Sequence, residues 1–341
     1  MKLAKYVSGV VSVVAIAALH MSVYGQSSAS RMPQIPHGTS PRELGLPELT
    51  DDPKPQELFA MVIAAAAKED PAGVNESIQQ FNLYGPFRFP NDTKVDIPMH
   101  RERKDSIFGI DISHWTASSF PVEQLATRNA AFLYMKTTQG GGVDGSFANF
   151  WQRSGNLTGI NRVHRGAYHF LTCGDPHVSA TEWGQRQAET FVKVLKANGG
   201  LLATDMPPAV DLEWDVTKTE HDRWVCRKPG DVINTTLAFL SEVKHQLHRT
   251  PILYTSQAWW RERIGTEEHF AAFSGYPIWL ADYSRSSRAS ETPPGINGTN
   301  WVLWQFTASA TMAIGFNAGF DANVFKGSPD GFLSTLEVAA F

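Results

Sequence analysis

Two carboxylates stand two residues apart at the end of an apolar run. The run 206–210 is typical of a buried strand, and Asp211 and Glu213 close it. Since side chains alternate along a strand, these two acids share one face. Like charges held close raise the pKa of one group while the other stays ionised, so the pair can supply both a proton donor and an anion. An acidic pair at a strand end can equally cap a helix or bind an arginine, so the pair alone leaves both interpretations open.

Other strand-like runs end in the same kinds of residue. Acids close three more of them, at Asp111, Asp282 and Asp321. The aromatic and histidine side chains at or near these ends are Trp115, Tyr168, His169, Tyr254, Trp279, Tyr283, Trp304 and Phe306. A sugar ring offers an apolar face for stacking and hydroxyls for carboxylates, and glycosidic cleavage needs one acid and one anion. The pattern indicates a carbohydrate site, although any single ring is equally typical of a core.

Short β-rich runs alternate with helical patterns from residue 108 onward, which predicts parallel strands with crossovers. The helical patterns cover 185–197 and 232–248. The expected strands are 108–112, 131–136, 166–171, 208–212, 251–255, 277–283, 302–307 and a short one near 316–321. We therefore expect the α/β class and an irregular (β/α) barrel of up to eight strands. In such barrels the reacting groups gather at the carboxyl ends of the strands.

The composition is that of an ordinary folded protein. The chain has 341 residues, is 42% hydrophobic and 19% charged, and carries a net charge of −4. Basic and acidic residues are interspersed, so the basic stripe expected of a nucleic-acid binder is missing. We exclude nucleic acid as a partner, while the oligomeric state is not readable from the sequence.

The N-terminal third divides into two parts. Residues 1–25 combine two lysines, a short apolar core and small residues before Gln26, which indicates a cleaved signal peptide and export to a periplasmic or extracellular space. A single-pass anchor is the alternative, but the apolar core is shorter than the roughly 20 residues of a membrane span, so no stable insertion is expected after cleavage. Residues 26–105 read as an extension with a helix at 55–68 and an aromatic stretch, 81–90, that packs on the main domain; the main domain covers 106–341.

The chain contains two cysteines, Cys173 and Cys226. Export would place them in an oxidising compartment, where a pair of cysteines is more often a disulfide than a metal or redox site. We expect a bond that ties together the loops after two different strands. Two unrelated thiols are the alternative.

Eight segments together resemble the glycoside hydrolase family 25 lysozymes, the Chalaropsis-type N-acetylmuramidases. No single motif carries the resemblance, which covers roughly 107–332. The segments, in the order of that family, are Gly109–Trp115, Tyr134–Gly140, Gly166–Phe170, Pro208–Glu213, Pro251–Ser256, Trp279–Tyr283, Trp304–Phe306 and Phe320–Asn323.

The resemblance implies hydrolysis of the β-1,4 bond between N-acetylmuramic acid and N-acetylglucosamine, with peptidoglycan strands as the partner. Its acids map onto Asp111, Asp211, Glu213 and Asp321, with Glu213 as proton donor and Asp211 as the anion near the anomeric carbon. The expected substrate-binding residues are Tyr168, His169, Tyr254, Trp279, Asp282, Tyr283, Trp304 and Gln305. Two alternatives stay open, namely a module that binds peptidoglycan without cutting it and a glycosidase for another amino-sugar polymer.

One position departs from the resemblance, because Gln139 stands where many members of the family carry glutamate. The glycine-rich stretch 140–144 lacks the lysine and spacing of a phosphate-binding loop and is typical of a flexible turn. His114 and His169 lack the short paired spacing of a zinc site, so no metal is expected. No cofactor is implied.

Overall fold

The computed structural model describes residues 38–50, 86–96, 100–216, 222–265, 267–284, 287, 290–312 and 316–341. The predicted signal peptide and the predicted helix at 55–68 lie outside these ranges. No helix within them is both long and apolar enough to cross a bilayer.

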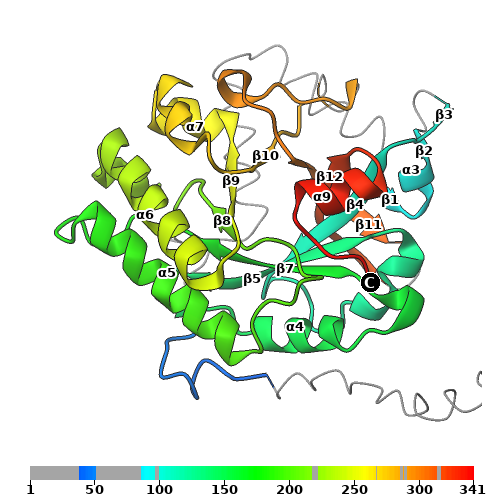
Figure 1. Cartoon of the computed structure of the whole chain (residues 1–341), viewed down its shortest axis with the longest axis horizontal. Coiled ribbons are helices and arrows are strands. Elements are labelled where there is room, and N and C mark those ends of the chain that lie inside the picture. The colour runs from blue at the N-terminus through cyan, green and yellow to red at the C-terminus, as the bar shows by residue number, and fades with distance from the viewer. Residues whose placement is uncertain are drawn as a thin grey trace, which may run out of the picture. The chain divides into compact units, whose positions relative to one another are not determined.

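Eight strands close into a barrel, as the sequence predicts (Figure 1). Seven successive strands pair in parallel, and the last strand pairs antiparallel with both the seventh and the first. The barrel strands are β4 (Ser106–Ile112), β5 (Phe132–Gln139), β7 (His164–Phe170), β8 (Ala209–Asp211), β9 (Ile252–Ser256), β10 (Ile278–Ala281), β11 (Leu303–Met312) and β12 (Phe316–Lys326).

The last strand differs from the prediction in direction and length. β12 continues to Lys326 and runs antiparallel to β11. Only residues 313–315 separate the two strands, and a parallel connection needs a dozen or more residues. The short connection therefore makes the closure of the barrel antiparallel, and it brings Asp321 opposite Asp111 in the pairing with β4.

Helices pack on the outside of the barrel. The two predicted helices are confirmed with longer bounds, as α5 and α6, and they lie side by side in Figure 1. Gly184 permits this close approach, since a Cβ there would lie 2.2 Å from the Thr235 carbonyl oxygen. The helices are α3 (Asn91–Lys94), α4 (Phe147–Gly155), α5 (Ala180–Ala197), α6 (Pro229–Leu247), α7 (Gln257–Arg263) and α9 (Pro329–Thr335).

Short elements fill the connections. The remaining strands are β1 (Arg88–Phe89), β2 (Val95–Asp96), β3 (Arg101–Glu102) and β6 (Gly142–Val143). The 3₁₀ helices are η1 (Val122–Gln124), η2 (Ala126–Arg128), η3 (Gly159–Asn161), η4 (Arg223–Cys226), η5 (Glu267–Phe273) and η6 (Ile296–Gly298).

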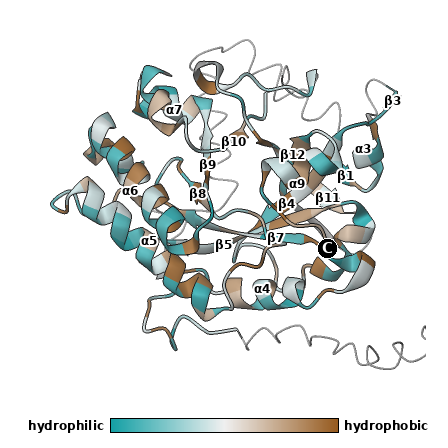
Figure 2. Ribbon diagram, viewed as in Figure 1, coloured by the Kyte–Doolittle hydropathy of each residue, from teal (hydrophilic) through white to brown (hydrophobic). Residues whose placement is uncertain are grey.

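Side chains that alternate along the strands contribute to two apolar layers. One layer fills the barrel interior, where Phe132, Tyr134 and Trp279 pack together. The other lies between barrel and helices, where Met135 and Leu280 belong. Figure 2 shows hydrophobic residues on the strands and hydrophilic residues along the outer helices. The layer to which a strand residue belongs therefore indicates whether its side chain points into the barrel or toward the helices.

Segments that precede the predicted domain boundary also pack on the barrel. β1 extends the sheet beside β11. Phe87 and Phe89 are buried, and Phe87 contacts the rings of Phe108 and Phe306. The predicted packing of the aromatic stretch 81–90 on the main domain is confirmed for these two residues.

Candidate active site

The acidic pair stands at the carboxyl end of β8. Ala209 faces the barrel interior, whereas Val210 and Leu212 face the outer layer. The alternation therefore puts Asp211 and Glu213 on the interior side. They are 8% and 7% exposed, so both carboxyl groups are largely removed from water.

A second carboxylate pair faces the first from the other side of the barrel. Asp111 and Asp321 are directly opposite one another in the antiparallel pairing of β4 with β12. Burial raises the pKa of Asp111 to about 6, although hydrogen bonds from Asn323 and Gln305 oppose the shift. Burial, and then the charges of Asp111 and Glu213, raise the pKa of Asp321 well above its ordinary value. Asp321 therefore keeps its proton at pH values at which ordinary carboxyl groups are ionised.

Two amides hold Asp111 in place. Asn323 Nδ2 and Gln305 Nε2 donate to Asp111 Oδ2 at 2.7 and 2.9 Å. The amides are oriented in turn, because Trp279 Nε1 donates to Asn323 Oδ1 at 2.8 Å and the Tyr254 hydroxyl donates to Gln305 Oε1 at 2.7 Å. The Tyr283 hydroxyl also donates to Gln305 Oε1. The structure thus brings four predicted site residues and Asp111 into one network.

Three tyrosines share the electrostatic environment of the acids. The pKa of Tyr254 is raised by burial, and then by Tyr283, Glu213, Asp211 and Asp111. Burial first, and then neighbouring acids that include Asp111 and Asp321, also raise the pKa of Tyr168 and that of Tyr283. The phenols therefore stay protonated beside several carboxyl groups, and those of Tyr254 and Tyr283 donate hydrogen bonds.

Sequence reasoning missed two polar residues of the barrel interior. Asn323 lies two residues after Asp321 on β12, and Lys136 lies two residues after the interior Tyr134 on β5. Lys136 is 5% exposed, donates to Gln139 Oε1, and has its ammonium 4.8 Å from the centre of the Phe170 ring. The period of two residues along each strand was the signal that could have found both.

His169 faces the helices, so the prediction that it contacts a sugar is wrong. Its ring is fully buried and stacks on Phe239 of α6 with centroids 4.7 Å apart. Nδ1 lies 2.7 Å from Thr138 Oγ1, and Nε2 lies 3.1 Å from Gln187 Oε1. Burial lowers the pKa of His169 to about 3, so the ring is a neutral part of the outer core.

Trp304 also lies outside the barrel, so its predicted place in the groove is wrong. It is 2% exposed and belongs to the outer apolar layer, next to Phe306. Its Nε1 donates to the Asp282 carbonyl oxygen at 2.7 Å. The carboxylate of Asp282 holds the following loop, accepting from Ser284 N at 2.7 Å and from Ser287 Oγ at 2.8 Å.

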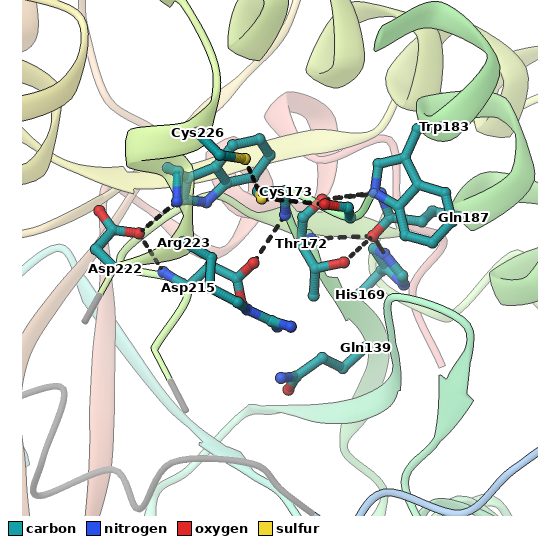
Figure 3. A network of polar contacts seen from close by, with 12 residues as sticks. Gln139, His169, Thr172, Cys173, Trp183, Gln187, Asp215, Asp222, Arg223 and Cys226 are labelled. Atoms are coloured by element: carbon teal, nitrogen blue, oxygen red, sulfur yellow. Dashed lines mark hydrogen bonds and ion pairs between the residues drawn. The ribbon is translucent and has the colours of Figure 1, made fainter. Parts of the chain in front are cut away.

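A polar network fixes the chain beyond Glu213 (Figure 3). Asp215 Oδ2 accepts from the Cys173 amide at 2.8 Å, and Asp215 Oδ1 accepts from Arg223 Nη2 at 2.6 Å. The Cys173 and Cys226 sulfurs lie 2.8 Å apart as two thiols. The loops after β7 and β8 are thus joined at Asp215, two residues after Glu213, and the disulfide stays a prediction.

No cluster of three or more histidine, cysteine or acidic side chains within the described ranges is arranged to hold a metal ion. His114 instead places Nδ1 2.9 Å from Asp144 Oδ2, as a side-chain pair.

A barrel with paired acids among aromatic rings at the carboxyl ends of its strands has the groups that a glycoside hydrolase needs. The model of the glycosyl hydrolases family 25 matches residues 110–313, more than half of the chain. The chain belongs to this family and is a glycoside hydrolase.

Relatives of known name share this part of the chain. Lysozyme M1 of Streptomyces globisporus is 29% identical over 232 residues, covering 64% of this chain and 68% of that protein. The N,O-diacetylmuramidase of Arthroderma benhamiae is 29% identical over 233 residues, covering 67% and 86%. The solved bacterial lysozyme from Streptomyces coelicolor has a TM-score of 0.55 at 24% identity and covers 68% of this chain and 97% of that chain, which shows a shared fold.

Proposed function

We propose that the chain is a lysozyme that hydrolyses the β-1,4 bond between N-acetylmuramic acid and N-acetylglucosamine in peptidoglycan. The observation that carries the proposal is the position of Asp211 and Glu213 on the interior side of the β8 end, with Asp111 and Asp321 paired across the barrel. The names of the relatives, a lysozyme and an N,O-diacetylmuramidase, support the same substrate.

Glu213 is proposed as the proton donor. The bond between the anomeric carbon and the glycosidic oxygen breaks, its electron pair stays on the oxygen, and the oxygen takes the Glu213 proton. Asp211 stabilises the positive charge that develops at the anomeric carbon, either as the nucleophile or by orienting the substrate's acetamido group. Water then adds to this carbon and gives its proton to the Glu213 carboxylate. The two acids belong to one short segment, which disfavours an inverting arrangement of this pair.

The second pair has a supporting part in this proposal. Asp321 retains its proton and donates a hydrogen bond to a sugar hydroxyl, whereas Asp111 is held by two amides and accepts one. Tyr168, Tyr254 and Tyr283 add neutral hydroxyls around the same space. Their protonated state follows from the raised pKa values of the phenols.

The test is muropeptide release from purified peptidoglycan by the mature protein, with the new reducing ends identified by mass spectrometry. Release that ends in reducing N-acetylmuramic acid, and that Glu213→Gln abolishes, supports the proposal. Glu189→Gln is the matched control, because Glu189 is exposed on α5. Binding without release would indicate a non-catalytic module, and release from chitin instead of peptidoglycan would indicate another amino-sugar polymer.

We also infer that the protein is exported through residues 1–25. The lysines followed by a short apolar core support this inference. Protein sequencing of the secreted form is expected to start at Gln26, whereas a start at Met1 on a membrane-bound form would contradict it.

A further inference from the structure

One exposed aromatic ring lies at the carboxyl end of the barrel strands. Trp115 follows β4 by three residues and is 38% exposed, whereas Tyr254 and Trp279 in the interior are 7% and 3% exposed. Within the described ranges, Phe341 is the other exposed large aromatic ring. It stacks on His164, at the opposite end of the strands. Trp115 therefore offers an apolar surface four residues from Asp111, at the rim of the proposed cleft.

The ring is held in position before any ligand arrives. A tight turn forms where Thr116 N donates to the Ser113 carbonyl oxygen at 2.9 Å and Trp115 N donates to Ser113 Oγ at 3.3 Å. The His114 ring lies against the Trp115 ring with centroids 4.7 Å apart. The buried Asp144 carboxylate binds the His114 backbone N–H at 2.8 Å and lies 2.9 Å from His114 Nδ1. A ring fixed in this way loses little conformational entropy on binding.

Asp144 is itself held by a segment that precedes the family match. It follows β6, where Val143 N donates to the Pro47 carbonyl oxygen at 2.9 Å and Leu49 N donates to the Val143 carbonyl oxygen at 3.1 Å. We call residues 47–49 the brace. The brace lies at the end of segment 38–50, which is also tied to α5 by the 2.9 Å bond from Lys193 Nζ to the Leu44 carbonyl oxygen.

The glycine-rich stretch 140–144 and Gly145 accommodate the brace. A Cβ on Gly142 would lie 2.6 Å from Leu49 Cδ2, and a Cβ on Gly145 would lie 2.1 Å from Glu48 Oε1. A Cβ on Gly141 would meet nothing within 4 Å. Two of these glycines therefore sit where the brace approaches the backbone closely.

We propose that Trp115 is a stacking platform for a hexosamine ring of the glycan strand, outside the subsites that flank the cleaved bond, and that the brace positions it through Asp144 and His114. This inference rests on the proposed glycan substrate. Aromatic side chains suit this ligand because a pyranose presents a face of C–H groups. Asp144 and the brace act through other residues and are positioning residues.

The test compares initial rates on polymeric peptidoglycan for the full chain and its variants. Trp115→Ala is expected to raise KM about 10-fold with a much smaller change in kcat, and Trp115→Phe is expected to restore most of the loss. Leu202→Ala is the control, because Leu202 is 42% exposed in the loop before β8, at the opposite end of the strands. An unchanged KM for Trp115→Ala, with the wild type active, would overturn the platform and leave the proposed function intact.

The brace is tested by removing one donor. Leu49→Pro deletes the N–H that binds Val143 and is expected to raise KM in the same direction as Trp115→Ala, while Leu49→Ala keeps the donor and has the smaller effect. A KM equal to that of the wild type in a folded Leu49→Pro would overturn the part assigned to the brace.

If the wild type proves inactive on peptidoglycan, sedimentation of each protein with insoluble peptidoglycan still tests the part assigned to Trp115. Weaker cosedimentation of Trp115→Ala supports the platform while the proposed hydrolysis fails, and equal cosedimentation overturns the platform.

Discussion

The two ends of the barrel treat buried charge in opposite ways. At the amino-terminal end, Arg165 binds both oxygens of Asp205 at 2.9 and 2.8 Å, and both side chains are 3% exposed. At the carboxyl-terminal end, Asp111 and Asp321 face one another with neutral amides and phenols around them. The first pair joins opposite charges, whereas Asp111 and Asp321 are like groups whose proton affinities are raised by burial. Paired buried charges are typical of a stabilising contact, whereas acids with raised pKa values at the carboxyl ends of barrel strands are typical of an active site.

The largest expected effect is on catalysis, from Glu213→Gln. Loss of a general acid is expected to lower kcat on peptidoglycan about 10²- to 10⁴-fold, while the midpoint of thermal unfolding stays within a few degrees of the wild type. Muropeptide release and calorimetry on the same preparation measure both. If the variant lost stability as well as activity, the assignment of Glu213 to catalysis alone would be contradicted.

The converse change is Asp205→Asn at the amino-terminal end. Because Arg165 would lose its charged partner while buried, the free energy of unfolding is expected to fall by about 3–5 kcal/mol, with activity per folded molecule retained. Urea denaturation measures the loss. Glu123→Gln is the matched control, since the Glu123 and Arg153 side chains are 50% and 26% exposed and such a pair contributes less than about 1 kcal/mol.

A further change tests the contact between Cys173 and Cys226, which joins the loops after β7 and β8. If Cys173 and Cys226 are bonded in the exported protein, the bond closes a loop between residues 53 apart in sequence, and its loss is expected to cost up to about 4 kcal/mol. Thermal unfolding with and without a reductant measures this, beside Cys226→Ser. The same unfolding midpoint in both conditions would show two thiols.

The pH dependence of stability distinguishes the mouth from the amino-terminal end. A buried acid with a raised pKa stabilises the folded state below its unfolded pKa, and this contribution is lost as the pH rises through the folded value. Between about pH 4 and 6 the burial of Asp111 therefore lowers the free energy of unfolding as the pH increases. Asp111→Asn is expected to flatten this fall and to gain about 1–3 kcal/mol at pH 7, while activity falls. Denaturation at several pH values decides, because an unchanged pH slope would contradict the assignment.

Local sequence patterns were sufficient to locate the eight strands, but not to predict the direction and length of the last one or the facing of every side chain. The eight apolar runs and the spacing of Asp211 and Glu213 follow from the period of two residues. The same period puts adjacent residues on opposite faces of a strand. Only one residue of the pair Tyr168 and His169, and only one of the pair Trp304 and Gln305, can therefore line the mouth. In the structure, Gln305 belongs to the interior network, whereas His169 and Trp304 lie in the outer layer.

Contacts between distant segments were beyond local patterns. The brace reaches β6 across more than ninety positions of the chain, and nothing in the composition of 26–105 indicates it. The register shift in β5 between Lys136 and Thr138 likewise depends on the pairing with β7, and it places Thr138 next to His169. Pairing between strands, rather than propensity, determines both features.

The smallest expected effect is at Gln139, where many family members carry glutamate. Lys136 donates to Gln139 Oε1 inside the mouth, so Gln139→Glu places a negative charge beside this ammonium and on the side of the acids. A further like charge favours the protonated form of neighbouring carboxyl groups, so the basic limb of the pH–activity profile is expected to move upward by a few tenths of a unit, with kcat changed less than about threefold. Gln152→Glu on α4, outside the barrel, is the control and is expected to leave the limb in place. A shift in the acid direction would mean that Lys136, rather than the carboxyl groups, dominates the local potential at the mouth.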